Sequence, residues 1–138
     1  MNFARRVVFD TGVLVSAAIL PESTPALALE KALLHFEICV STATLAELET
    51  VLLRQKFDRY ANAALRRAFI EGFRQHATLI AVVQEIADCA DPADNKFLAL
   101  AETAGAELIV ASDPHLNDLH PWRGIPIMPP AAFLVAIR

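Results

Sequence analysis

The chain has 138 residues, a length that fits a single domain over residues 1–138. Hydrophobic residues make up 55% of it and charged residues 20%, which supplies a buried core and excludes an intrinsically disordered protein. The net charge of −4 argues against a protein that holds nucleic acid through an overall basic surface, but it fits an enzyme whose clustered acidic residues hold cations.

The first half of the chain alternates between short apolar strands and helices. In chain order we predict a strand at 7–9, a helix at 12–20, a helix at 25–34, a strand at 36–40 and a helix from 42 to about 54. Pro21 ends the first helix, and Pro25 suits the first turn of the second. Ser41 or Thr42 can cap the third helix.

The second half continues the alternation. In chain order we predict a helix at 61–76, a strand at 78–83, a helix at 94–104, a strand at 107–111, a strand at 125–128 and a closing helix at 130–137. Gly105 ends the helix that precedes it. The basic residues on and near the helix at 61–76, Arg66 among them, can line a groove for phosphates, but a solvated helix face is the better interpretation for most of them.

This order of elements predicts the fold class. Strands that alternate with helices pair in parallel and carry helices on both faces of the sheet. We therefore expect an α/β fold, a single domain built on a parallel sheet of about five strands. Ligands of such sheets gather at the carboxyl ends of the strands, so the residues that follow each strand are the first candidates for a site.

Targeting segments are not apparent. No apolar run reaches the roughly 18 to 20 residues that a membrane-spanning helix needs. Asp10 interrupts the apolar stretch behind Arg5 and Arg6, so we expect no secretory signal. Cys39 and Cys89 are the only cysteines, and their spacing matches neither a disulfide framework nor a zinc site. We therefore expect a cytoplasmic protein without a membrane partner.

Four acidic residues are placed to reach the carboxyl edge of the sheet. Asp10 follows the first strand directly, and Asp113 follows the fourth by two residues. Glu47 lies early in the helix after the second strand, and Asp94 opens the helix before the fourth. Carboxylates about 4 Å apart repel each other by roughly 1 to 4 kcal/mol per pair unless a cation compensates. Oxygen ligands without histidine or thiolate favour Mg²⁺ or Mn²⁺ over zinc.

Each of these residues also has a structural interpretation. Asp10 can cap the first helix, and Asp113, which precedes a proline, is a typical helix start. Asp91 and Asp94 have the spacing of a capping box, and Glu47 can be a solvated helix residue. For any one residue alone the structural role is the better interpretation. The functional hypothesis depends on all of the acids meeting.

Several segments together resemble the PIN-domain family, in the branch that comprises the toxins of toxin–antitoxin pairs. These segments are Val7–Ala17, Ser41–Leu48, Asp91–Ala101, Ile109–Asp113 and the tail Gly124–Leu134. They follow one another in the family's order and cover essentially the whole chain. Any one of the motifs is weak, but the set in register is specific.

The resemblance implies a PIN-like sheet and hydrolysis of RNA phosphodiesters by a metal-activated water, with Mg²⁺ or Mn²⁺ as the cofactor. Asp10, Glu47, Asp94 and Asp113 match the family's metal-binding carboxylates, so it implies that they are the metal ligands and catalytic residues. It also implies three kinds of partner: an RNA substrate, a cognate antitoxin protein and a second copy of the chain in a homo-oligomer such as a dimer.

Further residues are candidates for supporting roles. Asp91, Thr11 and Ser112 lie beside the matched carboxylates and can contact them from outside the metal shell. Lys96, two residues beyond Asp94, is a candidate ligand for a substrate phosphate. No metal is assigned to the four histidines, which show no paired ligand spacing: His35, His76, His115 and His120.

One position departs from the family. Gly12 stands where PIN domains usually carry an asparagine that orients the first aspartate. This leaves open a catalytically eroded PIN-like binding module. A third interpretation is a phosphatase similar to the haloacid dehalogenases, because Phe9–Leu14 resembles their opening motif. That chemistry needs a second acid at the position of Gly12, so this interpretation ranks lowest.

Overall fold

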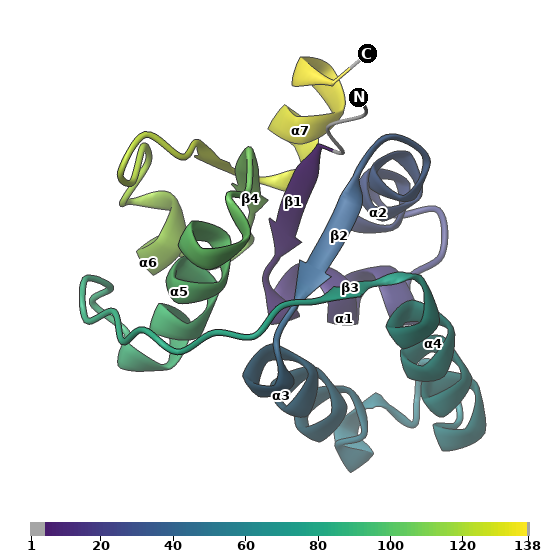
Figure 1. Cartoon of the computed structure of the whole chain (residues 1–138). Helices are drawn as coiled ribbons and strands as arrows, with labels where there is room; N and C mark the ends of the chain where they lie inside the picture. The colour runs from purple at the N-terminus through teal and green to yellow at the C-terminus, as the bar shows by residue number, and fades with distance from the viewer. Residues whose placement is uncertain (1–4, 138) are drawn as a thin grey trace.

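Five parallel strands form one sheet at the centre of the molecule (Figure 1). The computed structural model describes residues 5–137. The strands are β1 (Arg6–Phe9), β2 (Glu37–Val40), β3 (Thr78–Leu79), β4 (Leu108–Val110) and β5 (Ile127–Met128). Their order in the sheet is β3-β2-β1-β4-β5, with β1 in the middle. The predicted α/β class with a five-stranded parallel sheet is therefore confirmed.

The helices connect these strands. They are α1 (Thr11–Ile19), α2 (Thr24–His35), α3 (Thr42–Leu52), α4 (Ala63–His76), α5 (Asn95–Ala104), α6 (Pro114–Asn117) and α7 (Pro130–Ala136), with short 3-10 helices η1 (Gln55–Phe57) and η2 (Pro92–Asp94). Polar caps begin several of them: the side chains of Asp10, Ser23, Ser41 and Asn62 each accept a backbone N–H of the first turn. Gly105, at φ 63°, ends α5 in the left-handed conformation that glycine adopts without strain.

Alternate residues of β1 pack into two hydrophobic cores on opposite faces of the sheet. Val7 and Phe9 of β1 join a core with α1, α2, α3, α4 and α7. Val8 joins the second core, with α5 and α6. Both faces are thus covered, as Figure 1 shows, and the carboxyl ends of the strands remain the edge at which loops meet.

No single helix among residues 5–137 is long and apolar enough to cross a membrane. The helices α1 and α2 pass such a test only as a pair, and they are bent by 105° at the break between them.

The third strand is shorter than the predicted strand at 78–83. Thr78 and Leu79 pair with Cys39 and Val40, and the pairing stops there. Because β2 ends at Val40 and α3 begins two residues later, no neighbouring strand remains for a longer β3. The prediction of a six-residue strand was wrong for this reason.

Residues 80–88, which we call the crossing segment, run from β3 toward η2 without regular secondary structure (Figure 1). Ile80, Val82 and Ile86 pack against the second core, whereas Val83 between them is 93% exposed. The alternation that suggested a strand is thus a real burial pattern, but it covers α5 rather than continuing the sheet.

Arg66 lies neither on a solvated helix face nor in a phosphate groove, because only 1% of it is exposed. Its guanidinium donates to the carbonyls of Leu52, Arg54 and Ala61 at 2.8, 3.1 and 2.9 Å and forms an ion pair with Asp58. These carbonyls belong to the end of α3 and to the connection toward α4, so the arginine fixes that connection from inside.

Candidate metal centre

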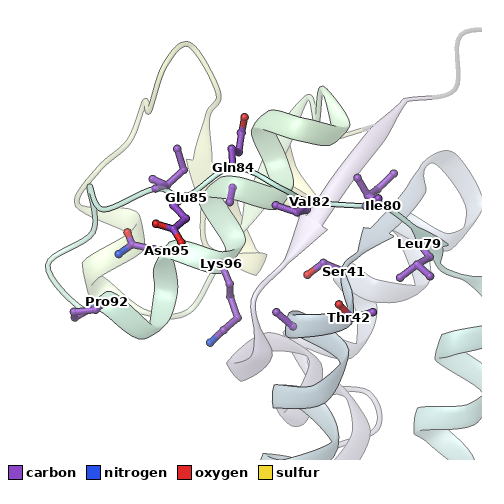
Figure 2. A pocket seen from close by; sticks show the side chains of 14 residues that line it. Ser41, Thr42, Leu79, Ile80, Val82, Gln84, Glu85, Pro92, Asn95 and Lys96 are labelled. Atoms are coloured by element: carbon purple, nitrogen blue, oxygen red, sulfur yellow. The ribbon is translucent and has the colours of Figure 1, made fainter.

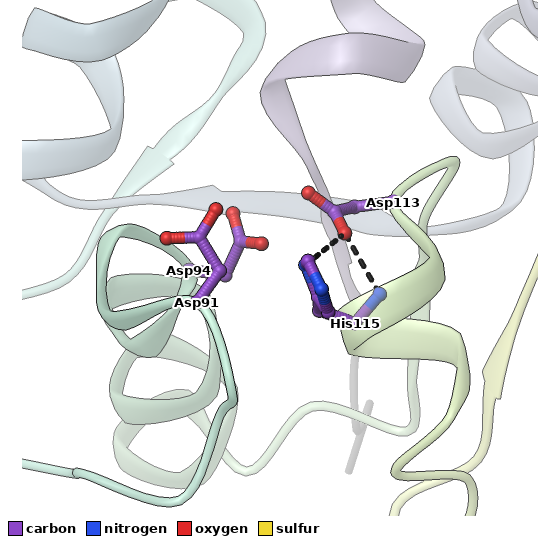
Figure 3. A group of neighbouring side chains, drawn as sticks. All are labelled: Asp91, Asp94, Asp113 and His115. Atoms are coloured by element: carbon purple, nitrogen blue, oxygen red, sulfur yellow. Dashed lines mark hydrogen bonds and ion pairs between the residues drawn. The ribbon is translucent and has the colours of Figure 1, made fainter.

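Three acidic residues and a histidine meet at the carboxyl edge of the sheet (Figure 3). One ligand atom from each of Asp91, Asp94, Asp113 and His115 lies within 4.8 Å of the others. Asp91 and Asp94 come from the η2 turn before α5, and Asp113 and His115 from the start of α6, after β4. We call this group the acidic cluster. Its members are separated by up to 24 positions in the sequence but join two neighbouring loops of the fold.

Local capping positions two of these carboxylates. One oxygen of Asp91 accepts the Ala93 N–H at 3.0 Å, and one oxygen of Asp113 accepts the His115 N–H at 2.8 Å. In Figure 3 the other oxygen of Asp113 points away from α6, toward the carboxylates of Asp91 and Asp94. Capping therefore fixes each carboxylate and leaves its second oxygen for a ligand.

Asp10 lies behind the acidic cluster and ties β1 to the end of β4. Only 3% of it is exposed. Its Oδ1 accepts the Val13 N–H at 2.9 Å, which caps α1, and its Oδ2 accepts the N–H groups of Ser112 at 2.9 Å and Asp113 at 3.1 Å. Burial, with the charge of Asp113, raises the pKa of Asp10 although these three amides oppose the rise. Asp10 thus sets where the backbone of Asp113 lies.

Asp94 is the most strongly perturbed residue of the acidic cluster. Burial is the largest cause that raises its pKa to about 7, followed by the hydrogen bond and charge of Asp113 and the charges of Asp91 and Asp10. Its Oδ2 is buried and has no hydrogen-bond partner among the described residues. A buried carboxylate oxygen without a donor, next to further carboxylates, is the environment that a divalent cation compensates.

Glu47 and Lys96 pair with each other at one side of this cluster. Lys96 Nζ forms an ion pair with Glu47 and donates to the Ala93 carbonyl at 2.6 Å. Both charged side chains are 25% exposed. The four acids expected to act together are therefore divided. Asp94 and Asp113 lie in the acidic cluster, Asp10 is bonded to its backbone, and Glu47 is held outside it by a lysine.

Ser112 and Thr11 were candidates for contacts around the carboxylates. The Ser112 backbone contacts Asp10, as described above, and its hydroxyl occupies the space in which a Cβ at Gly12 would lie. Thr11 is buried and its Oγ1 has no partner within the described chain. The glycine that departs from the family is thus accommodated by a serine on the neighbouring loop.

His115 is the residue that sequence reasoning missed. Its Nδ1 lies 3.4 Å from Asp113 Oδ1, and its ring belongs to the acidic cluster. The sequence assigns it no metal, because no second histidine stands at a paired ligand spacing from it. The available signal was its place two residues after Asp113 in the first turn of a helix at the sheet edge.

Comparison with known proteins places this arrangement in a family. A sequence profile described as the PIN domain matches residues 6–115. No curated protein sequence matches the chain. The structure is similar to VapBC2 from Rickettsia felis, crystallised with a DNA fragment from their promoter, at a TM-score of 0.60 and 13% identity over 88% of this chain and 96% of that one.

A second similar structure is VapC20 from Mycobacterium tuberculosis, a sarcin–ricin loop cleaving toxin. It has a TM-score of 0.52 and 13% identity, over 78% of this chain and 89% of that one. At this identity the two structures bear on the fold alone. The profile, by contrast, spans most of the sequence and includes every acid discussed above, and the chain therefore belongs to the PIN-domain family.

Proposed function

We propose that this chain is a metal-dependent endoribonuclease that acts in the cytoplasm as the toxin of a toxin–antitoxin pair. The observation that carries the proposal is the acidic cluster with its buried, unpartnered Asp94 oxygen. The names of the similar structures, a VapBC complex and an RNA-cleaving toxin, support an RNA substrate and an antitoxin partner. Self-association as a dimer remains part of the proposal by family resemblance.

The donor set suits Mg²⁺ or Mn²⁺. Asp94 and Asp113 offer free carboxylate oxygens on facing loops, and such oxygens are the ligands that these hard cations prefer. Asp10 lies outside this group and adds negative charge from behind it, while its own oxygens accept backbone amides. Asp91 and His115 are the remaining members of the acidic cluster. Glu47 can join only by leaving Lys96, which would free the lysine for a phosphate.

The chain's own residues then divide the work. When bound, the cation supplies a Lewis acid that activates water and neutralises charge on the phosphodiester. Asp10 holds the backbone at Asp113 through two amides, and His115 holds the Asp113 carboxylate in one orientation. Lys96, next to the acidic cluster, offers a positive charge to the phosphate of the substrate.

Cleavage of end-labelled RNA by the purified protein in Mg²⁺, Mn²⁺ or chelator tests this function. The informative variant is Asp113→Asn, because Asp10→Asn would turn an amide donor toward backbone N–H groups and disturb the fold. Asp118→Asn, an exposed aspartate outside the cluster, is the matched control. We expect ion-dependent cleavage by the parent and the control and none by Asp113→Asn. Equal cleavage by Asp113→Asn would refute the assignment, and a parent without cleavage or divalent-ion binding would indicate an eroded binding module.

A further inference from the structure

A cavity of about 690 Å³ adjoins the acidic cluster (Figure 2). Its walls are the first turn of α3, the crossing segment and the first turns of α5. The volume lies within the roughly 300–1,000 Å³ range of small-molecule and cofactor sites. None of the residues that hold the acidic cluster together lies among its lining, so it is a second site rather than part of the first.

The cavity and the acidic cluster share one turn of chain. Pro92 and Lys96 line the cavity, and Asp94, between them in sequence, belongs to the acidic cluster. The Lys96 side chain runs from α5 toward the start of α3 (Figure 2), and its ammonium pairs with Glu47. A polymer that crosses the acidic cluster with one unit is therefore positioned to place the neighbouring unit in the cavity.

One wall of the cavity is apolar. Ile80 and Val82 of the crossing segment and Ala99 of α5 contribute aliphatic surface. Gln84 and Asn95 add side-chain amides beside that surface. A flat ring with polar edges fits such a wall, because its faces pack on aliphatic groups and its edges meet amide donors and acceptors.

The opposite wall favours an anion. Ser41 and Thr44 form a capping box that satisfies the N–H groups of both residues. The N–H groups of Thr42 and Ala43, at the first two positions of α3, are the ones that a capping box leaves for a ligand. The charged side chains of the lining are Lys96, which is paired with Glu47, and Glu85, so a phosphate here would meet the two free amides and the lysine once Glu47 has left it.

We propose that this cavity binds the nucleotide adjacent to the scissile phosphodiester of single-stranded RNA. The base lies against the crossing segment, and its phosphate faces Lys96 and the start of α3. Only an unstacked base can enter, so the substrate is single-stranded at this position. The inference rests on the proposed nuclease function and adds where the strand lies. The adjoining acidic cluster, where the phosphodiester would be cleaved, favours RNA over an apolar peptide, and peptide binding is an outcome of the test.

Ala43→Trp fills the cavity from an exposed position, the second residue of α3. Ala64→Trp is the matched control, because Ala64 is also exposed and is the second residue of α4. The probe is a fluorescent 2′-O-methyl trinucleotide, which is not hydrolysed, and its affinity is measured by anisotropy without divalent ions. Amide chemical shifts of the parent protein, recorded with the same trinucleotide, locate where it binds.

We expect the trinucleotide to shift the amides of the crossing segment and of Asn95. Ala43→Trp should weaken binding about tenfold or more, the loss that corresponds to the roughly 1–3 kcal/mol of one base contact, and Ala64→Trp should not. Equal affinity of Ala43→Trp and the parent, or shifts confined to other surfaces, overturns the cavity as the nucleotide site. Failure of the trinucleotide to bind also overturns the proposal, and it is the result expected for a cavity that binds a peptide.

These outcomes are separate from those of the nuclease assay. If the parent binds the trinucleotide in the cavity but cleaves no RNA, the result contradicts the proposed enzyme activity and supports the binding site. If the parent cleaves RNA and Ala43→Trp cleaves it with the same KM, the nuclease activity stands and the cavity is not the nucleotide site.

Discussion

Replacing Asp94 with asparagine should stabilise the metal-free protein while removing its response to metal. Folding raises the pKa of this carboxyl from 3.8 to about 7. An aspartate with a raised folded-state pKa contributes stability that is present below pH 4 and lost as pH rises through about 7. At about 1.4 kcal/mol for each pH unit the upper limit is about 4 kcal/mol, and screening at the open side of the site reduces the expected loss to roughly 1 to 3 kcal/mol.

Asparagine keeps the shape of the protonated carboxyl and can donate to Asp113, so the variant should escape this loss. Urea unfolding in chelator between pH 4.5 and 8.5 measures it. We expect Asp94→Asn to exceed the parent by roughly 1 to 3 kcal/mol at pH 8.5, and the two to converge toward pH 4.5. Asp118→Asn should stay within about 0.5 kcal/mol of the parent throughout. Parallel pH profiles for the parent and Asp94→Asn would show that the cluster is not electrostatically strained.

Three further perturbations test other parts of the structure. Saturating Mn²⁺, at about 100 times its dissociation constant, should raise the unfolding free energy of the parent by about 2.7 kcal/mol, with a larger thermal shift at pH 8 than at pH 5, where protons compete. Arg66→Met should cost about 2 to 4 kcal/mol in urea unfolding, because it leaves the carbonyls of Leu52 and Ala61 without a donor, and the Arg54 carbonyl with the Phe57 N–H alone. Replacing the exposed Arg67 with Met should change little. Gly12→Ala should leave the free energy of unfolding nearly unchanged by itself, because the new Cβ meets the Ser112 hydroxyl. In a Ser112→Gly background, which removes that hydroxyl, the same change should stabilise the protein by roughly 0.5 to 1 kcal/mol. Additive effects of the two changes would contradict the contact between position 12 and Ser112.

The order of strands and helices could be predicted because each element carries a local signal. Val7 to Phe9 form a short apolar run, and Ser41 and Gly105 mark a helix start and a helix end. The length of β3 could not be read in the same way. Ile80 and Val82 alternate with exposed residues as a strand would, and only the early end of β2 prevents pairing. Strand length is a property of two segments, and a single segment does not contain it.

Charged residues were the least predictable, for a related reason. Arg66 shares its helix with exposed arginines, and nothing nearby in sequence indicates that three carbonyls and Asp58 surround its guanidinium. Glu47 and Lys96 are 49 positions apart, so their ion pair appears only once α3 and α5 lie side by side. The convergence of Asp94 and Asp113, by contrast, follows from the topology, because both flank β4 at the edge where open α/β sheets bind ligands.

From the sequence, helix capping and metal binding are alternative roles for these aspartates. In the structure one carboxylate can serve both. Asp91 and Asp113 each use one oxygen to cap a turn, and the same bond fixes the direction of the oxygen that faces the acidic cluster. Asp10 goes further, since both its oxygens bind amides and one of these amides belongs to Asp113 itself. A flexible surface aspartate would lose side-chain freedom on binding a cation, whereas these carboxylates have already lost it during folding. The helix starts at the sheet edge are thus the means by which this chain preorganises its acids.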